Sequence, residues 1–364
     1  MLKSLDLWLP SWIKRPKREP VQGVEHLLIT VCDHFEPFHG VEAPHALARV
    51  KQWHRDFTPI TAEFHDSNGQ PPKHTFFYPI EQYHPQVLQA LAELCSATKS
   101  ETEIHLHHDR DHADNLRLTL NQGMENFAKH GLLSRDSTGK IRYGFIHGNW
   151  ALDNSHPTGQ NCGVTNELQV LIDTGCYADF TMPSAPHPTQ TQTINSLYYA
   201  QASTTPKSHN HGRPVRALPH HQPASPDELL IVQGPLALNW NRRKYGILPR
   251  IENSDLTGAN PPTINRLRVW QKAGITVKGC PNWTFIKLHT HGANPKNSPM
   301  LLGQPMRQFH QSLRQLADTH PHLHFHYLTA REMVNVLHAA EQGHSDNPHL
   351  YRDHCYRLPP PPLS

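Results

Sequence analysis

The feature that most constrains the fold is an alternation of short apolar runs with helix-like segments along almost the whole chain. The runs are rich in β-branched and aromatic residues, which is typical of buried strands. They occupy residues 25–32, 73–78, 101–107, 141–148, 178–182, 228–233, 283–289 and 322–328. Helical spacing fills most intervals, at residues 43–65, 85–95, 111–130, 166–174, 265–273, 305–319 and 329–340. Strands alternating with helices predict a parallel sheet, and seven or eight such units favour a single α/β domain, a (β/α)7–8 barrel.

An open doubly wound sheet is the alternative, but the chain has no GxGxxG or GxxxxGK[ST] loop to support nucleotide binding. The barrel is expected over residues 22–343, between a basic and aromatic N-terminal arm (1–21) and a C-terminal tail (344–364). Residues 183–226 form a long segment rich in Pro, Ser, His and Thr. It follows a predicted strand end, where barrel enzymes build their active sites, so we expect a functional or disordered loop there.

Composition bears on partners and location. The 34 Lys and Arg residues nearly balance the 31 Asp and Glu residues and are scattered, so no nucleic acid partner is expected. No apolar run approaches the roughly 18 residues of a membrane span. The arm is expected to pack on the domain or to be loose, with weak contact to an anionic membrane surface as an alternative. Six isolated cysteines and no visible signal peptide predict a reducing, cytoplasmic location.

Histidine is unusually frequent, with 31 residues, and several histidines stand with carboxylates where predicted strands end. In a parallel barrel these ends meet on one face, and imidazole and carboxylate are ligands for Zn²⁺ and similar divalent ions. Alternation along a strand places His105 and His107 on one face and His108 on the other. The strand-end residues are Cys32, Asp33 and His34, then His105, His107, His108, Asp109 and Asp111, then His147, and finally His289 and His291.

Four short motifs occur in a characteristic order. They are TVCD at 30–33, TFF at 75–77, EI at 103–104 followed by His107, and IKLH at 286–289. This order resembles that of the NodB-type polysaccharide deacetylase superfamily, a carbohydrate esterase group with a distorted (β/α) barrel of the glycoside hydrolase and deacetylase type. The resemblance spans residues 25 to 340.

The resemblance implies a metal-dependent hydrolase that deacetylates N-acetylated sugars of a polysaccharide or its precursor. It places the metal, expected to be zinc, on Asp33, His107 and Asp111. The neighbouring His105, His108 and His112 are the alternates. It makes His289, or the nearby His291, the general acid that protonates the leaving amine.

Two departures mark a divergent branch. Cys32 stands where the family has its catalytic base, and Thr181-Met182-Pro183 stands where the family has an arginine motif. Another base, such as Glu36 or Asp153, is therefore expected, or a different reaction, or a loss of catalysis.

Substrate contacts are expected from residues near the predicted strand ends. A tryptophan near a strand end can stack on a sugar ring or pack in the core, and Trp150 and Trp240 have such positions. His147 lies three residues before Trp150 and is expected beside it. Arg213, in a basic stretch at 207–216, can meet an anionic sugar or remain solvated. Two other functions stay open. One is an amidohydrolase with a His-x-His pair at His105 and His107, although that pair usually lies on the first strand; the other is a non-catalytic glycan-binding barrel.

Overall fold

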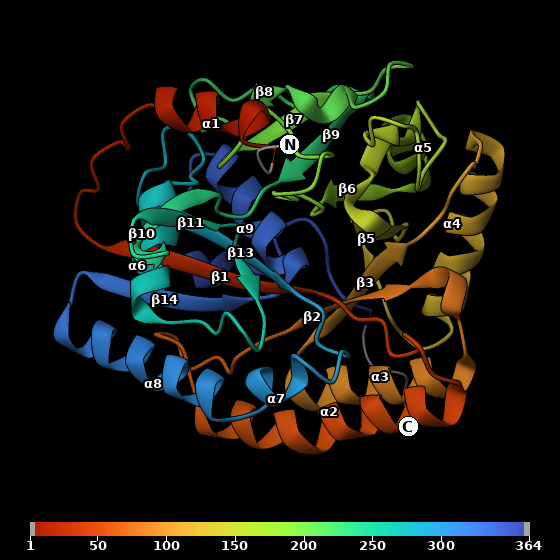
Figure 1. The fold of residues 1–364 in the computed structure, drawn as a ribbon, viewed down its shortest axis with the longest axis horizontal. Coiled ribbons are helices and arrows are strands. Elements are labelled where there is room, and N and C mark those ends of the chain that lie inside the picture. Colours follow the sequence, from red (N-terminus) through yellow and green to blue (C-terminus); the bar gives the residue numbers. More distant parts are fainter. Residues whose placement is uncertain (1–3, 360–364) are drawn as a thin grey trace.

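Strand β1 (Glu25–His34) is the centre of the sheet in the computed structural model, which describes residues 4–359. Strand β13 (Trp283–Thr290) pairs in parallel with one edge of β1 from His26 to Asp33. The other edge is shared, because β14 (Leu323–Leu328) pairs with its first half and β2 (Thr75–Pro79) with its last three residues. Figure 1 shows β1 crossing the middle of the molecule, between β13 and β14.

The sheet continues from β2 through parallel neighbours and ends in antiparallel strands. The parallel members are β3 (Glu101–Leu106), β5 (Ile141–His147), β6 (Cys176–Asp179) and β9 (Glu228–Val232). Beyond β9 lie β7 (Leu197–Gln201) and β8 (Arg213–Pro214), and a short strand β12 (Asp255–Leu256) borders β13 at the other end. Strand β4 (Ser134–Arg135) pairs antiparallel with β5.

The expected mixed α/β fold with a mostly parallel sheet is confirmed, but closure of a barrel is not seen. Within residues 4–359 the strand order is an open series from β12 to β8. A closed barrel would need the last strand between the seventh and the first, whereas β14 pairs with β1 on the edge that β2 shares. The sheet therefore has two ends.

Helices cover the two faces of the sheet unequally. On one face lie the helices after the early strands. Three long helices, α2 (Ala43–Glu63), α3 (Pro85–Thr98) and α8 (Gln304–Thr319), run along the bottom of Figure 1. On the other face lies α9 (Ala330–Glu341), which is buried at every residue except His338. The other helices between β1 and α9 are α4 (Ala113–Ala128), α5 (Glu167–Thr174), α6 (Ile264–Ala273) and α7 (Ser298–Leu301).

Alternation along the strands separates two hydrophobic cores. In β1, Leu27, Ile29 and Val31 pack under the outer helices, whereas Leu28 and Cys32 pack against the core that contains α9. That second core also draws residues from β2, β5, β6, β9 and β13. We therefore call the α9 side the inner face and the other side the outer face.

The segment 183–226, expected to be a loop, contains β7, β8 and a 3-10 turn at Ser208–Asn210. Strand β7 pairs antiparallel with β9 over five residues, so much of the segment belongs to the sheet. A hairpin of β10 (Ala237–Lys244) and β11 (Leu248–Glu252), which the sequence reading missed, projects beside α6.

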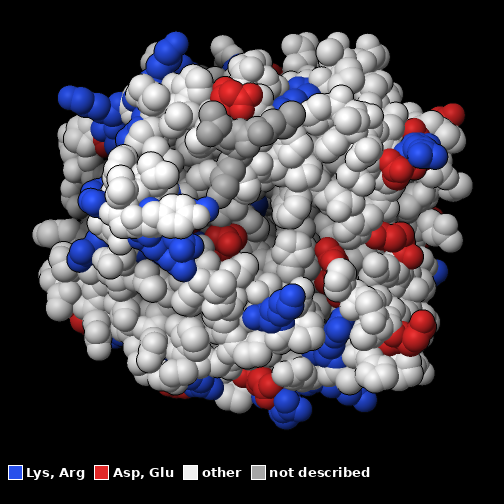
Figure 2. All heavy atoms as spheres, in the orientation of Figure 1, with Lys and Arg blue, Asp and Glu red and all other residues white. Residues whose placement is uncertain are grey.

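Both ends of the described chain pack on the domain. Helix α1 (Leu5–Lys14) buries Trp8 completely against Ala185 and Leu236. Near the other end, Arg352 is buried between Asp66 and Glu332, and most of the proline run of the expected tail lies outside the described residues. Among residues 4–359, no helix combines the length and the apolarity that crossing a bilayer requires. Figure 2 shows Lys and Arg gathered at the left of this face, over the arm and the β10–β11 hairpin.

Candidate active site

The alternation along the strands decides which strand-end residues meet. His34 continues the inner series of Leu28 and Cys32, whereas Asp33 continues the outer series of Leu27 and Val31. The same rule puts His105 of β3 on the inner face, because its neighbours Ile104 and Leu106 belong to the outer core. In β13 the inner residues are Trp283 and Phe285, so His289 and His291 follow on that face.

These inner residues form a cluster around Glu36, which lies in the turn after β1. The Oε1 atom of Glu36 is 3.3 Å from Nε2 of His105 and 3.5 Å from Nε2 of His107. His34, Glu36 and His105 each offer one ligand atom, all within 4.8 Å of one another. We call His34, Glu36, His105 and His107 the Glu36 cluster.

In two of these rings, hydrogen bonds engage the Nδ1 atom, which points away from Glu36. Nδ1 of His105 donates to the carbonyl of Ile146 at 2.9 Å, and Nδ1 of His107 donates to Oε1 of Glu81 at 2.8 Å. Both Nε2 atoms therefore face the Glu36 carboxylate, where a proton or a cation must lie between acceptors. Nε2 of His34 is buried and has no hydrogen-bond partner among the described residues. An oriented imidazole whose second nitrogen is hydrogen-bonded is the usual form of a histidine metal ligand.

The charges in the cluster follow from its contacts. Burial opposes ionisation of Glu36, but hydrogen bonds from His105 and His107 hold the pKa of that carboxyl well below its usual range. Burial also opposes protonation of His107, yet Glu36 and Glu81 raise its pKa to about 9. Without a metal, His107 is thus a cation between two carboxylates. Burial takes the pKa of His34 well below its ordinary value, and this ring is neutral.

Two histidines and a tryptophan adjoin the cluster. The His291 ring lies 4.7 Å from the His34 ring, and Trp150 lies 6.1 Å from each of them. His289 is 6.4 Å from His34 and only 5% exposed, whereas His291 is partly exposed. Burial lowers the pKa of both histidines. The predicted acids and Trp150 are thus brought together with the Glu36 cluster.

Asp33, the predicted metal ligand, lies on the outer face. Its Oδ2 is 2.8 Å from Nε2 of His74, and its Oδ1 accepts the backbone N–H of Gly292 at 2.6 Å. A Cβ at position 292 would lie 2.1 Å from Oδ2, so only glycine fits there. The structure pairs Asp33 with His74 and Gly292 and brings Glu36 to His107.

A second group of polar side chains gathers on the outer face around Glu167, the first residue of α5. Its Oε1 lies 3.0 Å from Nε2 of His108 and 3.5 Å from Nε2 of His147, and its Oε2 lies 3.5 Å from Sγ of Cys162. We call His108, His147, Cys162 and Glu167 the Glu167 cluster. The His108 side chain thus points away from His105 and His107, as alternation along β3 predicts. Cys162 and Glu167 were not predicted as site residues because neither stands at a strand end.

Three other predicted residues have structural partners, and a fourth, Trp240, is exposed. Asp111 holds Nδ1 of His108 at 3.0 Å, and Asp153 accepts two hydrogen bonds from Ser208. Burial raises the pKa of Asp153 to about 7. Arg213 pairs with Glu228 at 2.7 Å. Trp240 is 53% exposed on β10, part of the hairpin that the sequence reading missed.

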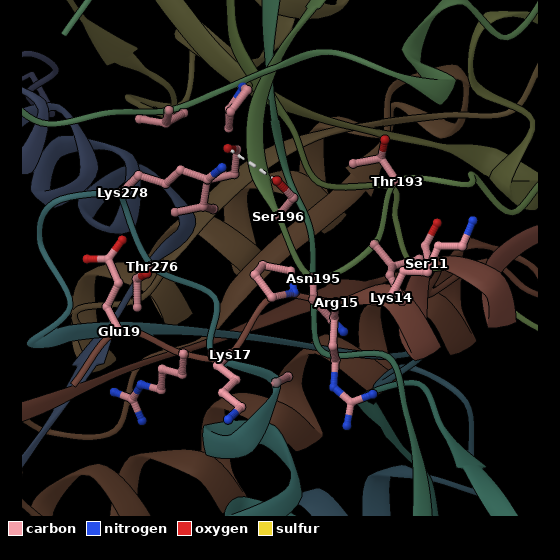
Figure 3. Close-up of a pocket in the computed structure, with 18 of the residues that line it drawn as sticks. Ser11, Lys14, Arg15, Lys17, Glu19, Thr193, Asn195, Ser196, Thr276 and Lys278 are labelled. Carbon is pink, nitrogen blue, oxygen red and sulfur yellow. Dashed lines mark hydrogen bonds between the residues drawn. The ribbon is translucent and has the colours of Figure 1, made fainter. Parts of the chain in front are cut away.

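A large cavity of about 1030 Å³ lies elsewhere, between the N-terminal arm and the edge of the sheet. Figure 3 shows Lys14, Arg15 and Lys17 of the arm on one side, with Asn195 and Ser196 lying close by. None of its lining residues belongs to the Glu36 cluster or the Glu167 cluster. Its basic lining residues are Lys14, Arg15, Lys17, Arg18, Arg216, Lys272 and Lys278.

The chain was compared with protein-family models, curated proteins and solved structures. No protein-family model matches it, and no curated protein matches it. A solved structure that does match is an alpha-mannosidase from Enterococcus faecalis V583, with a TM-score of 0.42 and 7% sequence identity. The alignment covers 86% of this chain and 29% of that one, so the chain spans less than a third of the length of the solved protein.

Proposed function

We propose that this protein is a metal-dependent hydrolase that removes N-acetyl groups from sugars of a polysaccharide or its precursor, with the Glu36 cluster as its centre. One observation carries the metal: two Nε2 atoms, each in a ring whose Nδ1 is hydrogen-bonded, face one carboxylate oxygen at 3.3 and 3.5 Å. Ligand atoms about 2.0–2.2 Å from a tetrahedral ion stand about 3.3–3.6 Å apart. The donor set of imidazoles and one carboxylate suits Zn²⁺.

The cluster keeps an accessible side, as a catalytic centre requires. The side chains of Glu36 and His107 are 17% and 29% exposed, whereas His105 is fully buried. Three protein ligands with one open position are typical of catalytic zinc, and closed sets of four are typical of structural zinc. Glu36, His105 and His107 would hold the ion, with His34 next to it.

The residues around this open side have separate roles in the proposed reaction. When bound, the ion supplies a Lewis acid that polarises the acetamide carbonyl and acidifies a water. His291 takes up a proton and delivers it to the departing nitrogen, so the C–N bond breaks while water oxygen joins the carbonyl carbon. Trp150 offers a ring face on which a sugar ring can stack. The deacetylase chemistry itself rests on the resemblance of the motif order.

The test is release of acetate from short N-acetylglucosamine oligomers by the zinc-loaded protein. We expect turnover that is lost in Glu36→Gln and retained in Glu42→Gln, the same chemical change at an exposed residue before α2. New reducing ends without acetate would instead indicate glycosidic cleavage. Binding of metal and oligomer without turnover would favour a glycan-binding protein, and either result would overturn the proposal.

A further inference from the structure

The Glu167 cluster joins three parts of the chain that are distant in sequence. His108 follows β3, His147 ends β5, Cys162 lies in the loop before α5, and Glu167 begins α5. Each offers one ligand atom, and these four atoms all lie within 4.8 Å of one another. Three of the four residues are fully buried, and the fourth, His108, has a side chain 8% exposed.

Both imidazoles present Nε2 to the centre because their Nδ1 atoms are engaged. Nδ1 of His147 donates to the carbonyl of Gly148 at 2.5 Å, and Nδ1 of His108 donates to Oδ2 of Asp111 at 3.0 Å. A carboxylate behind a histidine ring is a common support for a metal ligand. Asp111 therefore has the position of an orienting group.

In the part of the chain that the structure describes, the Nε2 atom of the neutral His147 ring is left without a hydrogen bond in this centre. This atom carries a lone pair, is fully buried, and finds no hydrogen-bond partner within residues 4–359. It faces the Glu167 carboxylate at 3.5 Å, which is a contact between two acceptors. A charged His108 can bridge Asp111 and Glu167, but it leaves His147 in this state. A cation between the four atoms would satisfy all of them.

We propose that the Glu167 cluster binds a second divalent metal ion as a closed structural site. The ligand atoms around zinc stand about 3.3–3.7 Å apart along the edges of a tetrahedron. The 3.5 Å separations from Glu167 to Nε2 of His147 and to Sγ of Cys162 lie in this range, and the 3.0 Å separation from Glu167 to Nε2 of His108 is slightly shorter. The thiolate selects zinc over magnesium or calcium. Binding releases the proton of the Cys162 thiol to solvent, together with any second proton on His108.

The site would fix the wall of the active centre. The loop between His147 and Cys162 contains Trp150, which lies beside His34. The backbone N–H of Asp153 donates to Oε2 of Glu167 at 2.5 Å, and Asp153 in turn holds Ser208 of the long segment. An ion on Glu167 would thus tie this loop, α5 and the 183–226 segment to the sheet. This role stands whether or not the Glu36 cluster deacetylates sugars.

The decisive measurement is X-ray absorption at the zinc edge in the Glu36→Gln protein, in which the Glu167 cluster itself is unaltered. We expect one sulfur at about 2.3 Å and three nitrogen or oxygen ligands at about 2.0–2.2 Å. Zinc bound without sulfur, or no bound zinc, would overturn the proposal.

Variants provide a second measurement on the folded protein. Cobalt-loaded protein should show a thiolate charge-transfer band that Cys162→Ser loses and Cys176→Ser keeps, since Cys176 is a buried thiol bonded to the Ala178 carbonyl. Zinc should fall from two ions per chain to one in Cys162→Ser and likewise in Glu36→Gln. A band that persists in Cys162→Ser would refute the site. Failure of deacetylation alone would leave all of these results unchanged.

Discussion

Replacing Glu36 by Gln tests the centre of the proposed active site with the smallest change of shape. The amide keeps the size of the side chain but removes the negative charge that Nε2 of His105 and His107 face at 3.3 and 3.5 Å. Groups that merely support a metal ligand change affinity by about 10–100-fold. Glu36 would contact the ion directly, so we expect a loss of at least about 100-fold, or about 2.8 kcal/mol.

The loss should appear in binding and in stability together. Titration of zinc into the Cys162→Ser background isolates this site, and the dissociation constant should rise at least about 100-fold. Since a ligand stabilises the folded state by RT ln(1 + [L]/Kd), the zinc-induced rise in the free energy of unfolding should shrink by about 2.8 kcal/mol. The metal-free variant should be about as stable as the parent, because the amide can donate to Nε2 of His105.

Glu42→Gln is the matched control, because it removes one exposed carboxylate on the same segment. Zinc affinity that is unchanged in Glu36→Gln would refute the assignment of Glu36 as a ligand. An equal loss in Glu42→Gln would mean that general electrostatics, and not coordination, governs binding.

Three further predictions concern the proton donor, a buried ion pair and the arm. His291→Ala should lower kcat by about 10²–10⁴-fold while zinc content stays constant, and an unchanged kcat would exclude His291 as the donor. Burial disfavours ionisation of Glu332, but Lys73 and Arg352 hold its pKa below the usual range. This carboxylate therefore stabilises the fold above about pH 4.5, and the contribution is lost as the pH falls. Glu332→Gln should cost about 3–5 kcal/mol at pH 7 in urea denaturation and progressively less below pH 4.5, whereas a constant cost would contradict the ion pair. Trp8→Ala should weaken docking of α1 by about 3 kcal/mol and speed protease cleavage before β1, and an unchanged cleavage rate would show that Trp8 does not hold the arm.

The order of strands and helices was predictable because each element carries its own local pattern. Strand β13 was expected at 283–289 and spans Trp283–Thr290, and α8 was expected at 305–319 and spans Gln304–Thr319. The division between His107 and His108 was predictable for the same reason, since alternation is local. Pairing of β14 with β1 depends on partners about 300 residues apart, and the open sheet could not be predicted from local patterns.

The placement of Asp33 and His34 shows where local reasoning fails. Every residue of β1 after Glu25 is buried, so polarity does not distinguish the inner from the outer face. The motif order favoured Asp33, but the alternation along β1 puts Asp33 on the outer face and puts His34 on the inner face, where it meets Glu36 and His105. Glu167 and Cys162 belong to a helix start and a loop, where no strand-end rule applies.

The central position of β1 in the sheet has a consequence for folding during synthesis on the ribosome. The first strand of the sheet needs β13, β14 and α9, which lie at the far end of the chain. At roughly 5–20 residues per second, about 300 further residues take roughly 15–60 s to synthesise. During that interval the apolar face of β1 has neither its later neighbouring strands nor its covering helix. Strand β1 therefore completes its pairing late, and the nascent chain must remain soluble while most of this strand lacks its partners.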